Sequence, residues 1–265
     1  MPTPAAFDLS GRVAAVTGAG SPDGIGFATA RLLAELGAAV MISATTSRVH
    51  DRVSELRAAG FDAAGAAGDL TNPDAAAALV SAAVDHWGRL DIVVNNAGMI
   101  SAASPVFESG TVESMDLPAW QAALARNLTT AFLVTKAALP AMTSRGWGRI
   151  IMVASVTGPV MAIRADAGYA AAKAGMIGLT RATAVDAAGH GITVNAVAPG
   201  WIATRSQTPD ERLQGLASPI ARSGTPGEVA AAIAWLASPG ASYTTGQYLV
   251  IDGGNSIAEQ RATPA

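Results

Sequence analysis

Short, mostly apolar runs recur along the chain, and each is followed by a longer stretch in which apolar and polar residues alternate with helical spacing. Continuous apolar runs are typical of strands that helices cover on both faces, as in a parallel sheet. The predicted strands are residues 13–17, 39–43, 62–67, 91–94, 149–154, 191–197 and 247–251.

The stretches between these strands carry the helical spacing. Predicted helices lie near residues 25–36, 48–59, 73–87, 118–145, 167–188 and 226–237. We expect the long helix at 118–145 to be broken. Repeated strand–helix–strand units form parallel sheets with right-handed crossovers. The pattern therefore predicts the α/β class, with a doubly wound parallel sheet of about seven strands and helices on both faces.

No linker interrupts this pattern, so residues 1–265 are expected to form a single domain, with 258–265 as a flexible tail. The stretches 99–117 and 201–225 contain Ser, Gly, Pro and charged residues and are predicted to be long loops. In open α/β sheets, ligands bind beyond the carboxyl ends of the strands, where such loops gather. These two stretches are therefore candidate walls of a binding site.

Composition limits the kinds of partner. Half of the 265 residues are hydrophobic, 14% are charged, and the formal net charge is −3. This balance lacks the basic surface that nucleic acids and anionic membranes attract, so neither partner is expected. The N-terminus has no signal-peptide pattern, and no apolar run approaches the ~20 residues of a membrane span. We expect a cytoplasmic protein.

Metal and thiol chemistry are not expected. The chain has no Cys, which excludes disulfides and a cysteine nucleophile. Its three His residues are scattered along the sequence without the spacing of metal ligands. No metal site is predicted.

A glycine-rich loop joins the first predicted strand to the first predicted helix, over residues 17–26. Glycines there allow a tight turn and a close approach of the backbone to a pyrophosphate, whose charge meets the free N–H groups of the helix N-terminus. The position between strand and helix favours this interpretation over an ordinary turn. The predicted contacts come from Gly18, Ser21, Gly24, Ile25 and Gly26.

Tyr169 and Lys173 stand four residues apart in the predicted helix 167–188, which places both side chains on one helix face. A phenol titrates near ~10, and a neighbouring ammonium favours the phenolate and lowers the pKa of the phenol. The pair therefore predicts a general acid/base, Tyr169, with a pKa that Lys173 lowers. The bare spacing also suits an ordinary surface pair, so the other motifs decide between the two interpretations.

Together these motifs resemble the short-chain dehydrogenase/reductase family. The glycine loop matches the family signature T-G-x-x-x-G-x-G with two additional residues, while N-N-A-G stands at 95–98 and P-G-x-I-x-T at 199–204. The likeness runs from Phe7 to Gly254 and is similar overall to 3-oxoacyl-carrier-protein reductases and related carbonyl reductases. It implies a Rossmann-type fold and hydride transfer between a nicotinamide cofactor and a secondary alcohol or ketone.

The resemblance implies four catalytic residues. Tyr169 is the general acid/base, and Lys173 tunes it. Ser155 follows the predicted strand 149–154 and hydrogen-bonds the substrate oxygen, although it stands one residue further from Tyr169 than is usual in the family. Thr157 is the second candidate for that role. Asn127 holds a water for proton relay through Lys173.

The resemblance also implies cofactor contacts at the ends of successive strands. Asp69 contacts the adenine, unless it only forms a turn, and Ile202 and Thr204 meet the carboxamide side of the nicotinamide. The remaining contacts implied are Leu70, Asn95, Ala97, Gly98, Tyr169, Lys173, Pro199 and Gly200.

The end of the second predicted strand indicates which cofactor is used. An acidic residue there binds the ribose 2′-hydroxyl of NAD, and the corresponding position is Ala44. Thr45, Thr46 and Arg48 can instead donate hydrogen bonds to the 2′-phosphate of NADP. The sequence therefore favours NADP(H), with NAD(H) possible.

Two observations weigh against a 2′-phosphate. Asp23 in the glycine loop would repel it, and Thr46 or Ser47 can serve as the N-cap of the next helix. A cap and a phosphate contact can coexist, so NADP(H) stays favoured.

The substrate is expected to be a small ketone or alcohol. Enoyl reductases of the same superfamily place tyrosine and lysine further apart, which argues against that reaction. The alternative is a catalytically inactive cofactor-binding scaffold or sensor. A predicted apolar rim favours a hydrophobic, cyclic or aromatic ketone over a sugar; it comprises Met99, Ile100, Val106, Phe107, Val160, Met161, Ile163 and Trp201.

Self-association is also expected. The predicted strand 247–251 should form a sheet edge, and the helix 226–237 carries more apolar residues than one sheet face needs. An exposed apolar patch beside a strand edge favours covering by a second copy. Together with the family resemblance, this predicts a homotetramer or a homodimer. The alternative is that the helix buries its whole apolar face within its own subunit.

Overall fold

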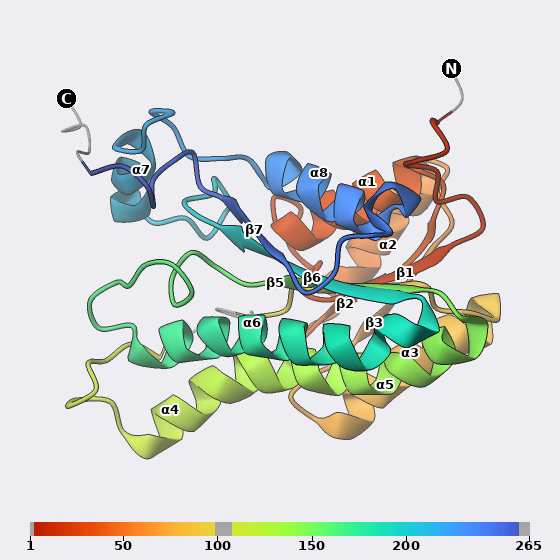
Figure 1. Cartoon of the computed structure of the whole chain (residues 1–265), viewed down its shortest axis with the longest axis horizontal. Coiled ribbons are helices and arrows are strands. Elements are labelled where there is room, and N and C mark those ends of the chain that lie inside the picture. The colour runs from red at the N-terminus through yellow and green to blue at the C-terminus, as the bar shows by residue number, and fades with distance from the viewer. Residues whose placement is uncertain (1–2, 99–107, 260–265) are drawn as a thin grey trace.

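A parallel β-sheet forms the centre of the molecule in the computed structural model, which describes residues 3–98 and 108–259 (Figure 1). The sheet has seven strands in the order β3-β2-β1-β4-β5-β6-β7, all parallel. The chain winds outward from β1 in one direction and then from β4 in the other, so the carboxyl ends of β1 and β4 form the switch point where ligands bind in such sheets. The predicted doubly wound sheet is confirmed. Its strands are β1 (Val13–Val16), β2 (Ala39–Ala44), β3 (Ala63–Ala67), β4 (Ile92–Asn95), β5 (Gly148–Val153), β6 (Ile192–Pro199) and β7 (Tyr248–Ile251).

Helices cover both faces of this sheet (Figure 1). One face packs against α1 (Ile25–Glu35), α2 (Arg48–Ala58) and α8 (Pro226–Ala237). The other packs against α3 (Pro73–Trp87), α5 (Thr130–Arg145) and α6 (Ala167–Ala187). Within β1, Ala14 and Val16 join the first core and Val13 and Ala15 join the second, which explains why the strands are apolar on consecutive residues.

Local sequence determines where the helices begin. The Asn72 side chain accepts a hydrogen bond from the Asp74 N–H, and Pro73 supplies the first residue of α3. Thr225 and Glu228 form a reciprocal capping box before α8, again with proline at the first position. Such caps satisfy backbone N–H groups that have no partner within the helix.

The long helix predicted at 118–145 is not broken, so that expectation was wrong. α4 (Leu117–Leu124) continues into one π-helical turn, η1 (Ala125–Thr129), and then into α5. A π turn accommodates one additional residue without interrupting the helix axis. Pro140 lies inside α5 without ending it.

The stretch predicted as a loop at 201–225 contains a helix, α7 (Pro209–Leu216). A capping box between Thr208 and Glu211 starts it, and this signal was present in the sequence. In the other predicted loop, Gly110 pairs with Asp166, while residues 99–107 lie outside the described part of the chain. Of the predicted tail 258–265, only 258–259 are described.

The end of the sheet differs from the expectation in one respect. β7 lies at the sheet edge as predicted. α8, however, buries Val229 and Ile233 completely against its own subunit, and its large exposed apolar side chain is Trp235 at 36%. The prediction of a surplus apolar face on this helix was therefore wrong, because α1 packs alongside it and covers residues that the sheet alone would leave exposed.

Within the described residues, no helix is both long and apolar enough to cross a membrane.

Candidate active site

A cavity of about 1430 Å³ lies at the carboxyl ends of the strands, and the loops that follow them form its walls. It joins the glycine loop at one end to the Tyr169 region at the other, which is enough room for a dinucleotide with a small substrate. Most of the predicted site residues line it: Gly18, Ser21, Gly24, Ile25, Thr45, Arg48, Asp69, Leu70, Ala97, Gly98, Ser155, Tyr169, Lys173, Pro199, Gly200, Ile202 and Thr204.

Four predicted residues do not line the cavity. The Asn95 side chain is buried in the core, where its Nδ2 donates a hydrogen bond to the Thr135 hydroxyl at 2.9 Å. Asn95 is thus placed in the sheet core because its side chain leaves β4 on the face covered by α5. Gly26, Thr46 and Asn127 also lie outside the lining.

The glycine loop is packed tightly against the end of β4. Gly18 has a φ of +69°, and a Cβ there would lie 2.9 Å from the Cα of Ala97. A Cβ on Gly26 would lie 2.5 Å from the Nδ2 of Asn96. Both positions therefore require glycine, even though Gly26 itself makes no wall of the cavity.

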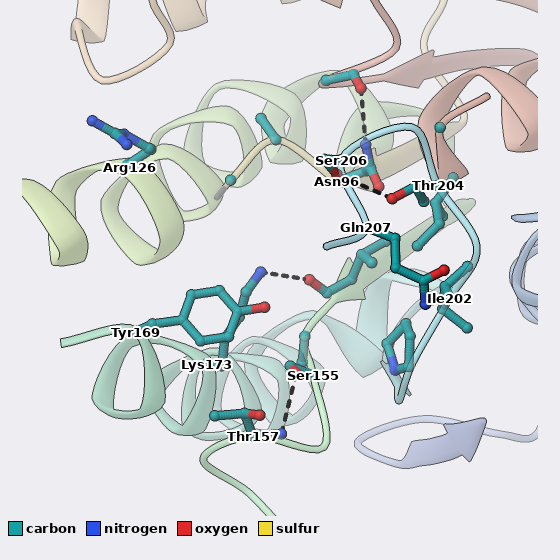
Figure 2. A pocket seen from close by; sticks show the side chains of 18 of the residues that line it. Asn96, Arg126, Ser155, Thr157, Tyr169, Lys173, Ile202, Thr204, Ser206 and Gln207 are labelled. Atoms are coloured by element: carbon teal, nitrogen blue, oxygen red, sulfur yellow. Dashed lines mark hydrogen bonds between the residues drawn. The ribbon is translucent and has the colours of Figure 1, made fainter. Parts of the chain in front are cut away.

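Asn96 was not among the predicted site residues. Its Nδ2 donates hydrogen bonds to the carbonyl oxygens of Thr17 (2.9 Å) and Gly18 (3.1 Å), which ties the glycine loop to β4 (Figure 2). The residues fit a pyrophosphate, because Gly24 at the N-cap of α1 has no side chain that could occupy the first N–H groups of that helix.

The end of β2 presents no carboxylate to the cavity. Ala44 and Thr45 line it, together with Arg48 at the start of α2, whereas Asp23 does not. Arg48 Nε donates to the Thr46 hydroxyl at 3.4 Å. Ser47 is the N-cap residue of α2, but its side chain makes no capping hydrogen bond. Asp69 also lines the cavity, and its Oδ1 accepts hydrogen bonds from the N–H and the hydroxyl of Thr71 within its own turn.

Tyr169 and Lys173 project from one side of α6 toward the cavity, with Ser155 beside them (Figure 2). Both side chains are buried, and the Lys173 ammonium lies 5.5 Å from the centre of the tyrosine ring. Lys173 Nζ donates a hydrogen bond to the Val153 carbonyl oxygen at 2.9 Å. The last residue of β5 thus holds the lysine in place.

Burial raises the pKa of Tyr169 to about 12, against a smaller lowering by the Ser155 side chain. Burial also lowers the pKa of Lys173 to about 8. The net shift is therefore opposite to the lowering that the sequence predicted, because burial of the phenol is its largest cause. At neutral pH Tyr169 holds its proton and can act as an acid.

Of the two candidate hydroxyl residues, Ser155 is the one that affects the pKa of Tyr169. The Ser155 side chain lowers the pKa of Tyr169, and its hydroxyl accepts a hydrogen bond from the Thr157 N–H at 3.1 Å. Thr157 also lines the cavity. The side chains of Ser155 and Thr157 are close together in Figure 2.

Asn127 lies in the π turn η1, behind the cavity wall. Its Nδ2 donates to the Ala123 carbonyl oxygen at 3.1 Å. A Cβ on Gly98 would lie 2.6 Å from Asn127 Oδ1 and 3.4 Å from Lys173 Nζ. Asn127 and Lys173 therefore both approach Gly98, and the side-chain oxygen of Asn127 faces the lysine end of the site.

The rim is more polar than the sequence predicted. Met161, Ile163 and Trp201 line the cavity and Val160 does not, while the predicted rim residues in 99–107 lie outside the described residues. Several polar lining residues were not predicted individually, although Ser206, Gln207, Asp210 and Glu211 lie in the stretch 201–225 that was predicted as a wall; the others include Asp166 and Asn255. Among the described residues, no group of three or more His, Cys, Asp or Glu could hold a metal ion.

The chain is similar to known proteins over almost its whole length. A family model described as enoyl-(acyl carrier protein) reductase matches residues 18–256. A cis-4-hydroxycyclohexanecarboxylate dehydrogenase of Sinomonas cyclohexanicum is 43% identical over 247 residues, covering 92% of this chain and 96% of that protein. A 3-oxoacyl-[acyl-carrier-protein] reductase of Vibrio cholerae is 41% identical over 252 residues, 94% of this chain and 98% of that protein.

Solved structures agree with these relatives. A short-chain type dehydrogenase/reductase from Mycobacterium marinum matches with a TM-score of 0.85 and 35% identity, over 96% of this chain and 98% of the other. The resemblance in the motifs is thereby confirmed. The chain belongs to the short-chain dehydrogenase/reductase family of oxidoreductases.

Proposed function

We propose that this protein interconverts a cyclic secondary alcohol and its ketone with NADP(H), using Tyr169 as the general acid/base. The observation that carries the proposal is the placement of Tyr169, Ser155 and Lys173 together in the same cavity as the glycine loop. An inactive scaffold or sensor gains no support from a site in which these three side chains lie together.

In reduction, the Tyr169 hydroxyl gives its proton to the substrate oxygen as negative charge develops there. Ser155 hydrogen-bonds the same oxygen and stabilises that charge. A bound nicotinamide supplies the hydride. Tyr169 recovers a proton through Lys173, with Asn127 positioned next to Gly98 to orient a water for the relay. In oxidation the same proton path runs in the opposite direction.

A cyclic substrate is supported by the lining and by one relative. Val156, Met161 and Ile202 contribute apolar surface beside the polar groups of the site. The dehydrogenase of Sinomonas cyclohexanicum is named for a substrate with a cyclohexane ring. Assays with cyclohexanol, cyclohexanone and open-chain analogues test the proposal. Failure to turn over any secondary alcohol or ketone with either cofactor would contradict it.

Cofactor preference is testable at the end of β2. We expect the wild type to show a higher kcat/KM with NADPH than with NADH. Ala44→Asp places a carboxylate beside the 2′-phosphate, and the repulsion should lower kcat/KM for NADPH at least about tenfold. Loss of the charge-assisted hydrogen bond in Arg48→Ala should have an effect of similar size.

The control for Arg48→Ala is Arg31→Ala, which removes the same charge from the exposed outer side of α1, away from the cavity. Its kcat/KM for both cofactors should stay within about twofold of the wild type. A wild type that prefers NADH would overturn the NADP(H) assignment.

We also propose that the protein forms a homotetramer or homodimer. Support comes from apolar side chains on the outer faces of two helices, where Phe132 of α5 is 46% exposed and Val185 of α6 is 80% exposed. The edge strand β7 adds Leu249, which is 42% exposed. Light scattering at micromolar concentration should give a mass of two or four chains. A mass near 26.5 kDa would contradict the proposal.

A further inference from the structure

The side chain of Asp166 is the clearest polar group of the cavity that the proposed chemistry does not use. It lies directly before α6, three residues before Tyr169, and lines the same cavity. Only 8% of the residue is exposed. Its Oδ1 is buried and has no hydrogen-bond partner among the described residues, and no ion pair to Asp166 is found there.

The backbone at this position has a structural role that the carboxyl group does not share. The Gly110 N–H donates a hydrogen bond to the Ala165 carbonyl oxygen at 2.8 Å. The Ala167 N–H donates one to the Gly110 carbonyl oxygen at 3.4 Å. Ala165 adopts a φ of +57°, which is unfavourable for alanine. Asp166 is also the N-cap residue of α6, yet its side chain makes no capping hydrogen bond. The fold thus fixes the position of the residue without using its carboxyl oxygens.

The location of this carboxyl group is unfavourable for folding. Burial raises the pKa of Asp166 to about 6, which means that the fold disfavours the ionised form. The charge of Asp166 in turn raises the pKa of Tyr169, and both side chains line the same cavity. A buried polar group without a partner is costly, and such groups in a cavity are typical of binding sites.

We propose that Asp166 contacts the substrate directly and accepts a hydrogen bond from a second hydroxyl group, so that preferred substrates are cyclic diols and hydroxyketones. This inference rests on the proposed function and names its substrate class. The acceptor requires a donor on the ligand. A ligand carboxylate next to Asp166 is disfavoured, because an ionised carboxylate has no proton to donate and carries the same charge. In this respect we expect a different preference from the relative named for a hydroxycyclohexanecarboxylate.

The test compares kcat/KM for cyclohexane-1,4-diol with kcat/KM for cyclohexanol. A hydrogen bond to a charged group should make the wild type prefer the diol by about 10- to 100-fold. Asp166→Asn keeps an acceptor but removes the charge, so the preference should fall to roughly tenfold or less. Asp166→Leu should abolish it. The ratio cancels any general damage to catalysis, which affects both substrates.

Asp210→Asn is the matched control, because Asp210 is an exposed carboxylate that lines the same cavity on α7. The Asp210→Asn variant should prefer the diol over cyclohexanol by the same factor as the wild type does. Thermal unfolding separates a structural role: Asp166→Asn should raise Tm at pH 8, since it removes a buried charge. A lower Tm in this variant, or an unchanged diol preference in Asp166→Leu, would overturn the proposal.

A binding measurement separates this inference from the proposed function. If the wild type turns over neither alcohol, the proposed function fails. The inference is then decided by ligand-induced stabilisation: the diol should raise Tm of the wild type more than cyclohexanol does, and Asp166→Leu should lose that difference. Equal shifts, or none, would overturn it. Faster turnover of 4-aminocyclohexanol than of the diol would overturn the hydroxyl assignment.

Discussion

Tyr169→Phe is expected to lower kcat by about 10²- to 10⁴-fold, the usual contribution of a positioned acid or base. Phenylalanine keeps the ring whose centre lies 5.5 Å from the Lys173 ammonium and removes only the hydroxyl group. The cofactor Kd should therefore change little. Steady-state kinetics with the best cyclic ketone, together with cofactor titration by fluorescence, measure the two effects.

Tyr248→Phe is the matched control for this variant. Tyr248 lies on β7, is partly buried, and is not a lining residue of the cavity. Its kcat should stay close to that of the wild type. If kcat of Tyr169→Phe remains within tenfold of the wild type, another group transfers the proton and the role given to Tyr169 is wrong.

Asp91→Ala is expected to lower the free energy of unfolding by about 3 kcal/mol, toward the lower end of what breaking a buried ion pair costs. Asp91 is completely buried at the amino end of β4. Its carboxylate accepts hydrogen bonds from the Val13 N–H at 2.9 Å, from Arg12 at 3.2 Å and from Arg89 at 2.7 and 2.6 Å. The two arginines are about a quarter exposed, so water can partly replace the lost carboxylate.

Urea unfolding measures this loss through the midpoint concentration at an unchanged m-value. Glu35→Ala is the comparison, because it breaks the exposed pair of Arg31 and Glu35 and should cost less than about 1 kcal/mol. Asp91 lies at the amino end of β4, whereas the cavity lies at the carboxyl ends of the strands. The kcat per folded molecule should therefore be retained. Equal losses of unfolding free energy in Asp91→Ala and Glu35→Ala would show that the buried carboxylate of Asp91 stabilises the fold no more than an exposed ion pair does.

The sequence was sufficient to predict the sheet because the five inner strands, β2, β1, β4, β5 and β6, are buried on both faces. Consecutive apolar residues such as those of β1 face the two cores alternately, and only the edge strands β3 and β7 are partly exposed among the strands described. The helices that follow them carry the expected spacing. α7 was missed because it is short and polar, although the capping box at Thr208 and Glu211 marks its start.

Other features depend on three-dimensional surroundings that no local pattern encodes. The choice between Asn95 and Asn96 as the residue facing the cavity depends on how β4 ends against the glycine loop. The direction of the Tyr169 pKa shift depends on how completely α6 and β5 remove the phenol from water. The unpartnered Oδ1 of Asp166 becomes visible only when its neighbours are known.

The π turn η1 has a consequence for which changes in chain length the protein can tolerate. Each residue of an α-helix advances by about 100°, so one additional residue rotates everything on one side of it relative to the other. Because of this phase shift, the same continuous rod presents Ala122 and Arg126 to the cavity and packs Val134 and Ala138 into the sheet core. Deleting one residue from 125–129 would restore regular hydrogen bonding while turning one of the two faces away from its neighbours. We therefore expect single-residue deletions in this segment to be far more harmful than most substitutions there.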